Sequence, residues 1–114
     1  MNTAMTTYVS LLTAIVLEVV GTSFLHQSQQ FTRLWPTLVM GLCYAGAFYC
    51  LSIALKAMPV GIAYAIWAGL GIVLITAVGY FAFGQSLDAP ALVGIGLIVA
   101  GVVIVNAFSS VIPH

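Results

Sequence analysis

The sequence predicts an all-α integral membrane protein built from four transmembrane helices. Of the 114 residues, 63% are hydrophobic and 4% are charged, whereas a soluble domain carries about 25% charged residues. The apolar residues gather in four long runs that are separated by short polar breaks. A small domain leaves a large fraction of its surface exposed, so a chain this apolar has to face lipid.

The first two helices are expected over residues 6–26 and 34–56. The first apolar run ends at a polar stretch, residues 26–33, that carries one positive charge. Trp35 and Pro36 open the second run. Trp suits the membrane interface and Pro is tolerated in a first helical turn, so both fit a helix start at this point.

The third and fourth helices are expected over residues 60–83 and 89–109. Asp88 is placed to cap the fourth helix, and Pro90 follows in its first turn. Each predicted helix has roughly the 20 residues that cross a hydrocarbon core. Short connections make consecutive helices antiparallel. Residues 1–114 are therefore expected to form a single transmembrane domain with both termini on one side.

The charges outside the helices give the chain little preference for one orientation. Arg33 lies in the first break and Lys56 in the second, on opposite sides of the membrane. Lys and Arg in short loops normally set the cytoplasmic side, and here the two sides are balanced. We therefore expect the chain to insert both ways round, which lets copies of opposite orientation pair. The net charge of zero does not indicate a nucleic-acid partner.

Glu18 is the residue that points most directly to a function. It lies near the middle of the first apolar run, where a carboxylate is costly and usually serves as an ion or proton site. The alternative is a protonated Glu that holds helices together through hydrogen bonds. Helical spacing places further side chains on the Glu18 face. They are Leu11, Ala14, Ile15, Gly21, Thr22 and Leu25.

Aromatic residues occupy one face of each of the next two predicted helices. Tyr44 and Phe48 share a face of the second helix, and Tyr64 and Trp67 share a face of the third. Such stripes are commonly packing surfaces. However, aromatic faces beside a carboxylate attract large, weakly hydrated cations such as quaternary ammoniums. Together with Glu18, these residues favour a cation pocket. We expect neither a metal site nor a cofactor.

Glycines mark two further features. Gly69 and Gly71 lie near the middle of the third predicted helix, where paired glycines either allow close packing or form a hinge. A hinge would serve alternating access, and the sequence leaves both possibilities open. Small residues on the fourth helix indicate a helix–helix contact, which we interpret as a dimer interface with internal packing as the alternative. Its expected members are Gly94, Leu97, Ile98, Gly101 and Val102.

Six segments of the chain together resemble a known family. They are Glu18-Val19-Val20-Gly21-Thr22, Phe31-Thr32-Arg33-Leu34-Trp35-Pro36, residues 59–67, residues 69–74, Gly84-Gln85 with Leu87-Asp88, and residues 94–102. In this order and on this length they resemble the small multidrug resistance family of bacterial inner-membrane transporters. The resemblance covers nearly the whole chain.

The family resemblance implies an antiparallel homodimer that exchanges protons for hydrophobic or quaternary ammonium cations. It gives Glu18 the role of binding protons and drug in turn. It also implies a kink at the paired glycines and dimerisation through the fourth helix. Members that export guanidinium tend to carry Trp three residues after this Glu. Gly21 stands there, which favours the subtype that exports drugs and quaternary ammonium compounds.

The predicted function is that of a secondary active transporter in the bacterial inner membrane, not an enzyme. The residues expected around the bound proton and cation are Leu11, Ala14, Ile15, Glu18, Gly21, Thr22, Tyr44, Phe48, Tyr64 and Trp67. Three alternatives remain: a transporter of small quaternary metabolites such as betaine or choline, a proton-conducting subunit, and a structural protein with four membrane spans.

Overall fold

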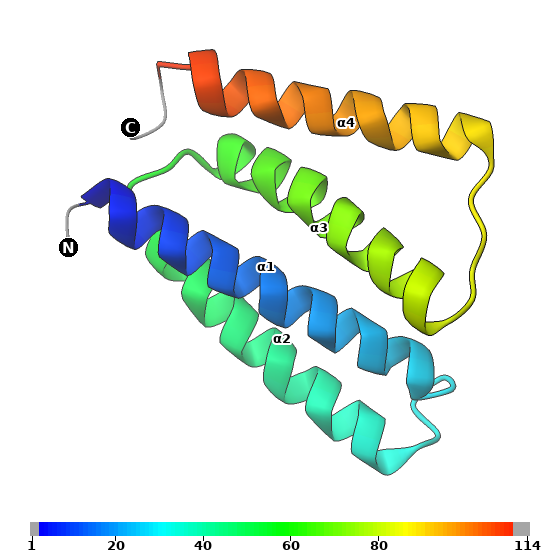
Figure 1. The fold of residues 1–114 in the computed structure, drawn as a ribbon. Coiled ribbons are helices and arrows are strands. Elements are labelled where there is room, and N and C mark those ends of the chain that lie inside the picture. The colour runs from blue at the N-terminus through cyan, green and yellow to red at the C-terminus, as the bar shows by residue number, and fades with distance from the viewer. Residues whose placement is uncertain (1–2, 111–114) are drawn as a thin grey trace.

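A computed structural model describes residues 3–110 of the chain. The helices of this part are α1 (Thr3–Gln27), α2 (Leu34–Ala54), α3 (Val60–Ala82) and α4 (Ala89–Phe108). All four are long and apolar enough to cross a membrane, which confirms the predicted fold class for the described residues. Consecutive helices run in opposite directions. The α1–α2 and α3–α4 connections lie at one end, and the α2–α3 connection lies at the other (Figure 1).

The helix ends follow the local sequence. Asp88 caps α4, because its Oδ1 accepts a hydrogen bond of 3.0 Å from the backbone N–H of Ala91. α1 begins at Thr3 rather than at residue 6, and α2 ends at Ala54 rather than at residue 56. After Ala54 the backbone tightens into bonds between residues three apart, such as Lys56 N–H to Ile53 C=O at 3.2 Å. Such bonds commonly close a last helical turn.

The connection between α1 and α2 is a compact turn built around Ser28, which is fully buried. Its hydroxyl donates to the carbonyl of Leu25 at 2.7 Å and accepts from the N–H of Phe31 at 3.1 Å. Three successive residues, 29–31, have positive φ angles between 50° and 65°. This left-handed conformation is unfavourable for residues with a Cβ, so the bonds to Ser28 help to hold it. The turn keeps α1 and α2 side by side.

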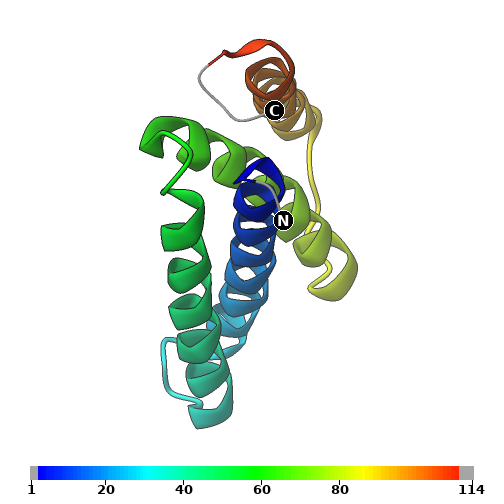
Figure 2. The same cartoon turned by 90° about the vertical axis from the view of Figure 1, so that its left-hand side faces the viewer.

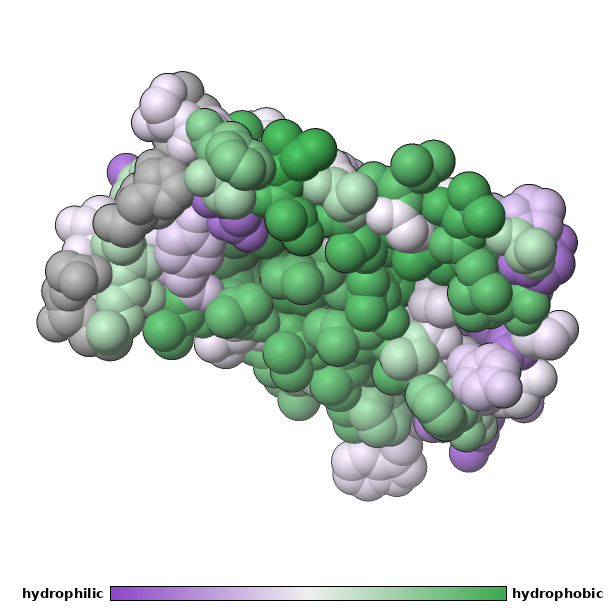
Figure 3. Space-filling model, turned by 45° about the horizontal axis from the view of Figure 1, so that its top comes forward, coloured by the Kyte–Doolittle hydropathy of each residue, from purple (hydrophilic) through white to green (hydrophobic). Residues whose placement is uncertain are grey.

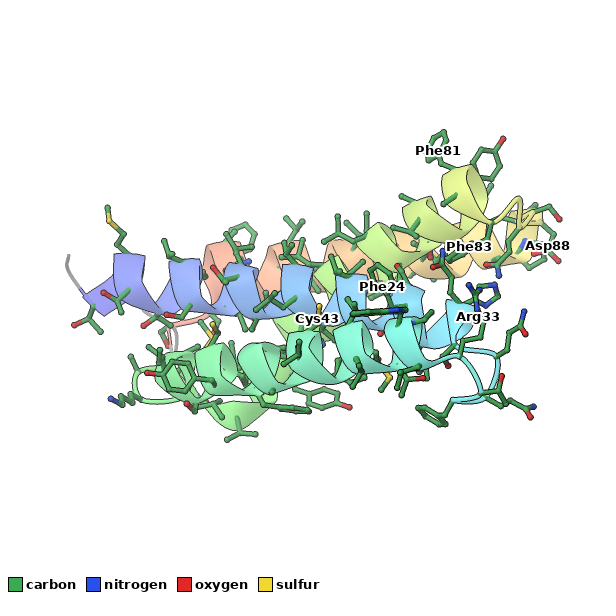
Figure 4. All side chains as sticks on the ribbon, turned by 90° about the horizontal axis from the view of Figure 1, so that it is seen from below. Phe24, Arg33, Cys43, Phe81, Phe83 and Asp88 are labelled. Carbon is green, nitrogen blue, oxygen red and sulfur yellow. The ribbon has the colours of Figure 1, made fainter. Side chains whose placement is uncertain are left out.

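α1 is central to the packing. It lies along α2, and α3 crosses it, while α4 packs against α3 and stands away from α2 (Figures 1 and 2). The buried core is Leu11, Ile15, Val19, Ala54, Met58, Ala63, Ile66 and Val102. At one end, the His26 and Phe83 rings lie 4.3 Å apart between centroids and connect the last turn of α1 to the end of α3. Arg33 and Asp88 lie at this same end (Figure 4).

The outer surface is that of a membrane protein. Apolar side chains cover the middle of the face in Figure 3, and hydrophilic residues gather mainly toward its two ends. α4 contributes several large exposed apolar side chains, among them Leu97 and Phe108. Because lipid tails are as apolar as these side chains, their exposure is the expected arrangement for helices that face lipid.

Candidate functional site

A cavity of about 370 Å³ lies between α1, α2 and α3 and has Glu18 in its wall. Small-molecule pockets in proteins measure about 300 to 1,000 Å³ and are mostly apolar. Its lining residues are Glu18, Tyr44, Ala47, Phe48, Leu51, Leu55, Val60, Ala63, Tyr64, Trp67 and Ala68. The cavity therefore has the size and the walls of a site for an organic ligand, with one acidic group inside.

Two hydroxyl groups connect Glu18 to the neighbouring helix. The Thr22 hydroxyl lies one turn further along α1 and donates to Glu18 Oε1 at 2.8 Å. The same hydroxyl oxygen is 2.7 Å from the Tyr44 hydroxyl on α2. Half-buried Glu18 is thus held on one side by a hydrogen-bonded chain that crosses from α1 to α2.

Gly21 explains how Tyr44 comes so close to α1. A Cβ atom at this position would lie 2.8 Å from two carbons of the Tyr44 ring, closer than van der Waals contact allows. The missing side chain leaves room for the ring, and the ring in turn carries its hydroxyl to Thr22. The group that approaches α1 at Gly21 is therefore the ring of Tyr44.

Aromatic side chains from α2 and α3 form part of the cavity wall. The Phe48 and Trp67 rings are stacked, with centroids 6.4 Å apart and an interplanar angle of 26°. Tyr64 also lines the cavity and is 74% exposed in the single chain, so it lies where the cavity opens. Gly71 leaves space beside the acidic group, since a Cβ there would be 3.8 Å from Glu18 Oε2.

Three other residues predicted on the Glu18 face take other places. Leu11, Ala14 and Ile15 are almost completely buried in the helix packing and do not line the cavity. Sequence reasoning did not select Leu55, Val60, Ala63 and Ala68, which do line it. Ala63 and Ala68 lie within one turn of Tyr64 and Trp67 on α3, and this spacing is the signal that could have identified them.

The two glycines of α3 face different neighbours, although α3 is a continuous helix through both. A Cβ at Gly69 would overlap the side chain of Val102 on α4, whereas Gly71 faces Glu18. Gly69 thus serves close packing of α3 and α4, and the hinge stays a prediction.

On α4, one member of the predicted dimer interface packs within the chain. Val102 is 9% exposed and belongs to the core. By contrast, open space surrounds Gly94 and Gly101, and Leu97 and Ile98 are exposed. The intermolecular role of these four residues stays a prediction.

Metal-binding residues do not cluster in the part of the chain that the structure describes. Within residues 3–110, no group of three or more His, Cys, Asp or Glu side chains is arranged to hold a metal ion.

The fold and the cavity together define a class: a multi-pass membrane protein with an aromatic, ligand-sized cavity around one carboxylate. The sequence model of the family described as "Small Multidrug Resistance protein" matches residues 6–98. The chain therefore belongs to the small multidrug resistance family, as its sequence motifs predicted.

Named relatives align over almost the full length of the chain. It is 52% identical over 104 residues to the quaternary ammonium compound-resistance protein QacE of Escherichia coli, covering 91% of this chain and 94% of the relative. It is 48% identical over 110 residues to the multidrug transporter EmrE of Escherichia coli strain K12, covering 96% and 100%. The quaternary ammonium compound-resistance protein QacF of Klebsiella aerogenes is 51% identical over 110 residues, covering 96% of this chain and 100% of the relative.

Proposed function

We propose that this protein is a proton-coupled antiporter that exports hydrophobic or quaternary ammonium cations across the bacterial inner membrane. The observation that carries the proposal is the single carboxylate of Glu18 in an otherwise apolar and aromatic cavity within the membrane-spanning helices. Protons and cations compete for this one group, so that binding of one weakens binding of the other.

The walls of the cavity support the choice of cargo. Removing a small, strongly hydrated ion from water into an apolar cavity is costly. A large cation with its charge shielded by carbon groups loses less hydration and gains contact with apolar walls. The faces of Phe48, Tyr64 and Trp67 add cation–π attraction, which is worth about 2 kcal/mol when desolvated. The printed names of the relatives, which refer to quaternary ammonium compounds and multidrug transport, support the same class of cargo.

We further propose that the working unit is an antiparallel homodimer. The exposed apolar face of α4, with open space at Gly94 and Gly101, supports a helix–helix contact through this helix. The exposure of Tyr64 at the cavity opening supports a second copy that completes the site. Bending of α3 at Gly69 and Gly71 would expose the cavity to each side of the membrane in turn.

The decisive experiment counts protons released when tetraphenylphosphonium binds to the purified protein at several pH values. We expect the wild type to release protons on binding, and Glu18→Gln to bind weakly, to release none and to lose transport into vesicles driven by a pH gradient. Glu18→Asp keeps the carboxylate and should retain part of the activity. The matched control is Asp88→Asn, which removes an acidic group outside the cavity and keeps a good helix cap.

Each alternative gives a different result in this experiment. Uphill export by Glu18→Gln would refute the proposal and favour a structural role for the residue. Proton flux through the wild type that needs no cation would favour a proton-conducting subunit. Proton-releasing binding of choline or betaine, without binding of tetraphenylphosphonium, would favour a transporter of small quaternary metabolites.

A further inference from the structure

The oxygen atoms of Glu18, Thr22 and Tyr44 form a continuous hydrogen-bonded chain from the carboxylate to the cavity wall. Thr22 Oγ1 donates to Glu18 Oε1 at 2.8 Å and lies 2.7 Å from the hydroxyl oxygen of Tyr44. Tyr44 is also a lining residue of the cavity. The chain therefore joins the acidic group to a second residue of the cavity wall.

Counting hydrogens fixes the direction of this chain while Glu18 is ionised. A Thr hydroxyl has one hydrogen and an ionised carboxylate has none. Since the Thr22 hydrogen points to Glu18 Oε1, the hydrogen between the two hydroxyl groups has to come from Tyr44. The lone pairs of the Tyr44 oxygen are then left for the cavity, where they attract a cation.

A proton that binds at Glu18 Oε1 reverses the direction. The protonated carboxyl group becomes a donor to Thr22 Oγ1, so the Thr22 hydrogen turns to the Tyr44 oxygen. The Tyr44 hydrogen has to leave that contact and turn toward the cavity. The only covalent change is the O–H bond formed at Glu18, because both hydroxyl groups merely rotate about their C–O bonds.

We propose that Thr22 is a positioning residue that transmits the protonation state of Glu18 to Tyr44. When Glu18 is ionised, the Tyr44 oxygen presents lone pairs that attract a cation to the cavity. When Glu18 is protonated, Tyr44 presents its hydrogen, which repels the cation. This inference rests on the proposed exchange of a proton for a cation at Glu18 and adds a second element to it. The charge of Glu18 is then not the only source of competition. Reversal of the Tyr44 dipole adds to the exclusion of the cation when a proton is bound.

The structure offers closely matched variants to test this proposal. Thr22→Val has nearly the same shape and removes the hydroxyl, Thr22→Ser restores it, and Tyr44→Phe removes the other end of the chain. The control is Thr13→Val. Thr13 lies on the exposed side of the same helix, and its hydroxyl donates to the carbonyl of Val9 at 2.8 Å.

The measurement is the affinity of the full-length protein in lipid nanodiscs for tetraphenylphosphonium, followed to its limiting values at high and low pH. The ratio of these limits measures the coupling between proton and cation. We expect Thr22→Val to reduce this ratio about tenfold, the equivalent of one hydrogen bond to a charged group. Thr22→Ser and Thr13→Val should stay within about twofold of the wild type, since they keep that bond.

Tyr44→Phe and the double variant with Thr22→Val should both match the single Thr22→Val variant, because all three break the same chain. A variant that only altered proton binding would move the pH of the transition and leave the limiting ratio unchanged. An unchanged ratio in Thr22→Val and Tyr44→Phe would overturn this inference alone, provided that the wild type releases protons on binding. Absence of proton release in the wild type would instead overturn the proposed function.

Discussion

All four helices are long and apolar enough to cross a membrane, but the three that surround Glu18 and the fourth beside them are built differently. The hydroxyl groups of Thr22 on α1 and Tyr44 on α2 meet beside Glu18, and α3 adds Tyr64 and Trp67 to the same cavity. α4 contributes one side chain, Val102, to the core, and most of its large side chains are exposed. The comparison indicates that polar atoms and glycines, rather than total apolarity, decide what each membrane helix does in this protein.

The largest expected effect tests how α4 packs against α3. Gly69→Leu places a side chain where Val102 already lies, and Val is stiff at χ1 in a helix. We expect the free energy of unfolding to fall by about 3 kcal/mol, the upper end for an overpacked site. Thermal or denaturant unfolding in detergent measures this loss.

The control for Gly69→Leu is Gly61→Leu, on the same helix but with open space around its Cβ position. That variant should unfold within about 0.5 kcal/mol of the wild type, as is usual for surface substitutions. Equal losses in both variants would contradict the idea that α4 is held by close contact at Gly69.

The next largest effect tests the cavity that α1, α2 and α3 surround. Trp67→Ala removes the ring that stacks with Phe48 beside Glu18. We expect the affinity for tetraphenylphosphonium at high pH to fall by about 2 kcal/mol, or about 30-fold, because a desolvated cation–π contact is lost. Calorimetric titration of the purified protein measures the change.

Trp35→Ala is the matched control for the ring at position 67. Trp35 is 75% exposed in the first turn of α2 and does not line the cavity, so its removal should leave the affinity almost unchanged. Equal weakening by the two variants would mean that the aromatic residues act through membrane anchoring or folding rather than through the cavity.

Much of the fold follows directly from the sequence because the membrane sets the length of an apolar helix. Apolar runs and their polar breaks predict the four helices. α2 ends at Ala54, two residues before the approximate end expected from the sequence, since the last turn tightens before the connection to α3. Hydropathy does not register that change, because Leu55 and Ala57 are themselves apolar.

The site could be predicted only in part, because helical spacing shows which residues share a face but not what that face meets. Glu18 was found as a lone carboxylate in an apolar run and the aromatic residues by their helical spacing, and they do line one cavity. Leu11 and Ile15 share the Glu18 face, yet they pack in the core. The contact of Gly21 with the Tyr44 ring depends on how far α1 and α2 are shifted along each other. No pattern within one helix contains that information.

The same limit applies to α4, where lipid and protein surroundings are equally apolar. Val102 was expected with Gly94 and Gly101 at a contact between copies. Its burial against Gly69 depends instead on the missing side chain of α3. The role of a small residue on one helix can therefore be assigned only once the side chain opposite to it is known.

The smallest expected effect concerns a hydrogen bond that joins α1, one of the helices around Glu18, to α4. The Tyr8 hydroxyl on α1 donates to Asn106 Oδ1 on α4 at 2.9 Å. Tyr8→Phe should lower the free energy of unfolding by about 1 kcal/mol, since hydrogen bonds between membrane helices are worth about 0.6 to 2 kcal/mol. Tyr80→Phe, at an exposed tyrosine on α3, serves as the control and should change it little.

A double-mutant cycle with Asn106→Ala isolates the contribution of that bond from the other contacts of both side chains. We expect a coupling energy of about 0.6 kcal/mol between Tyr8 and Asn106, the average for such bonds in a membrane protein. A coupling energy of zero would mean that α1 and α4 are energetically independent here and that packing on α3 accounts for the attachment of α4. A coupling energy well above that average would instead make the start of α1 and the end of α4 one unit, and the division between cavity helices and outer helix would no longer hold at this end of the molecule.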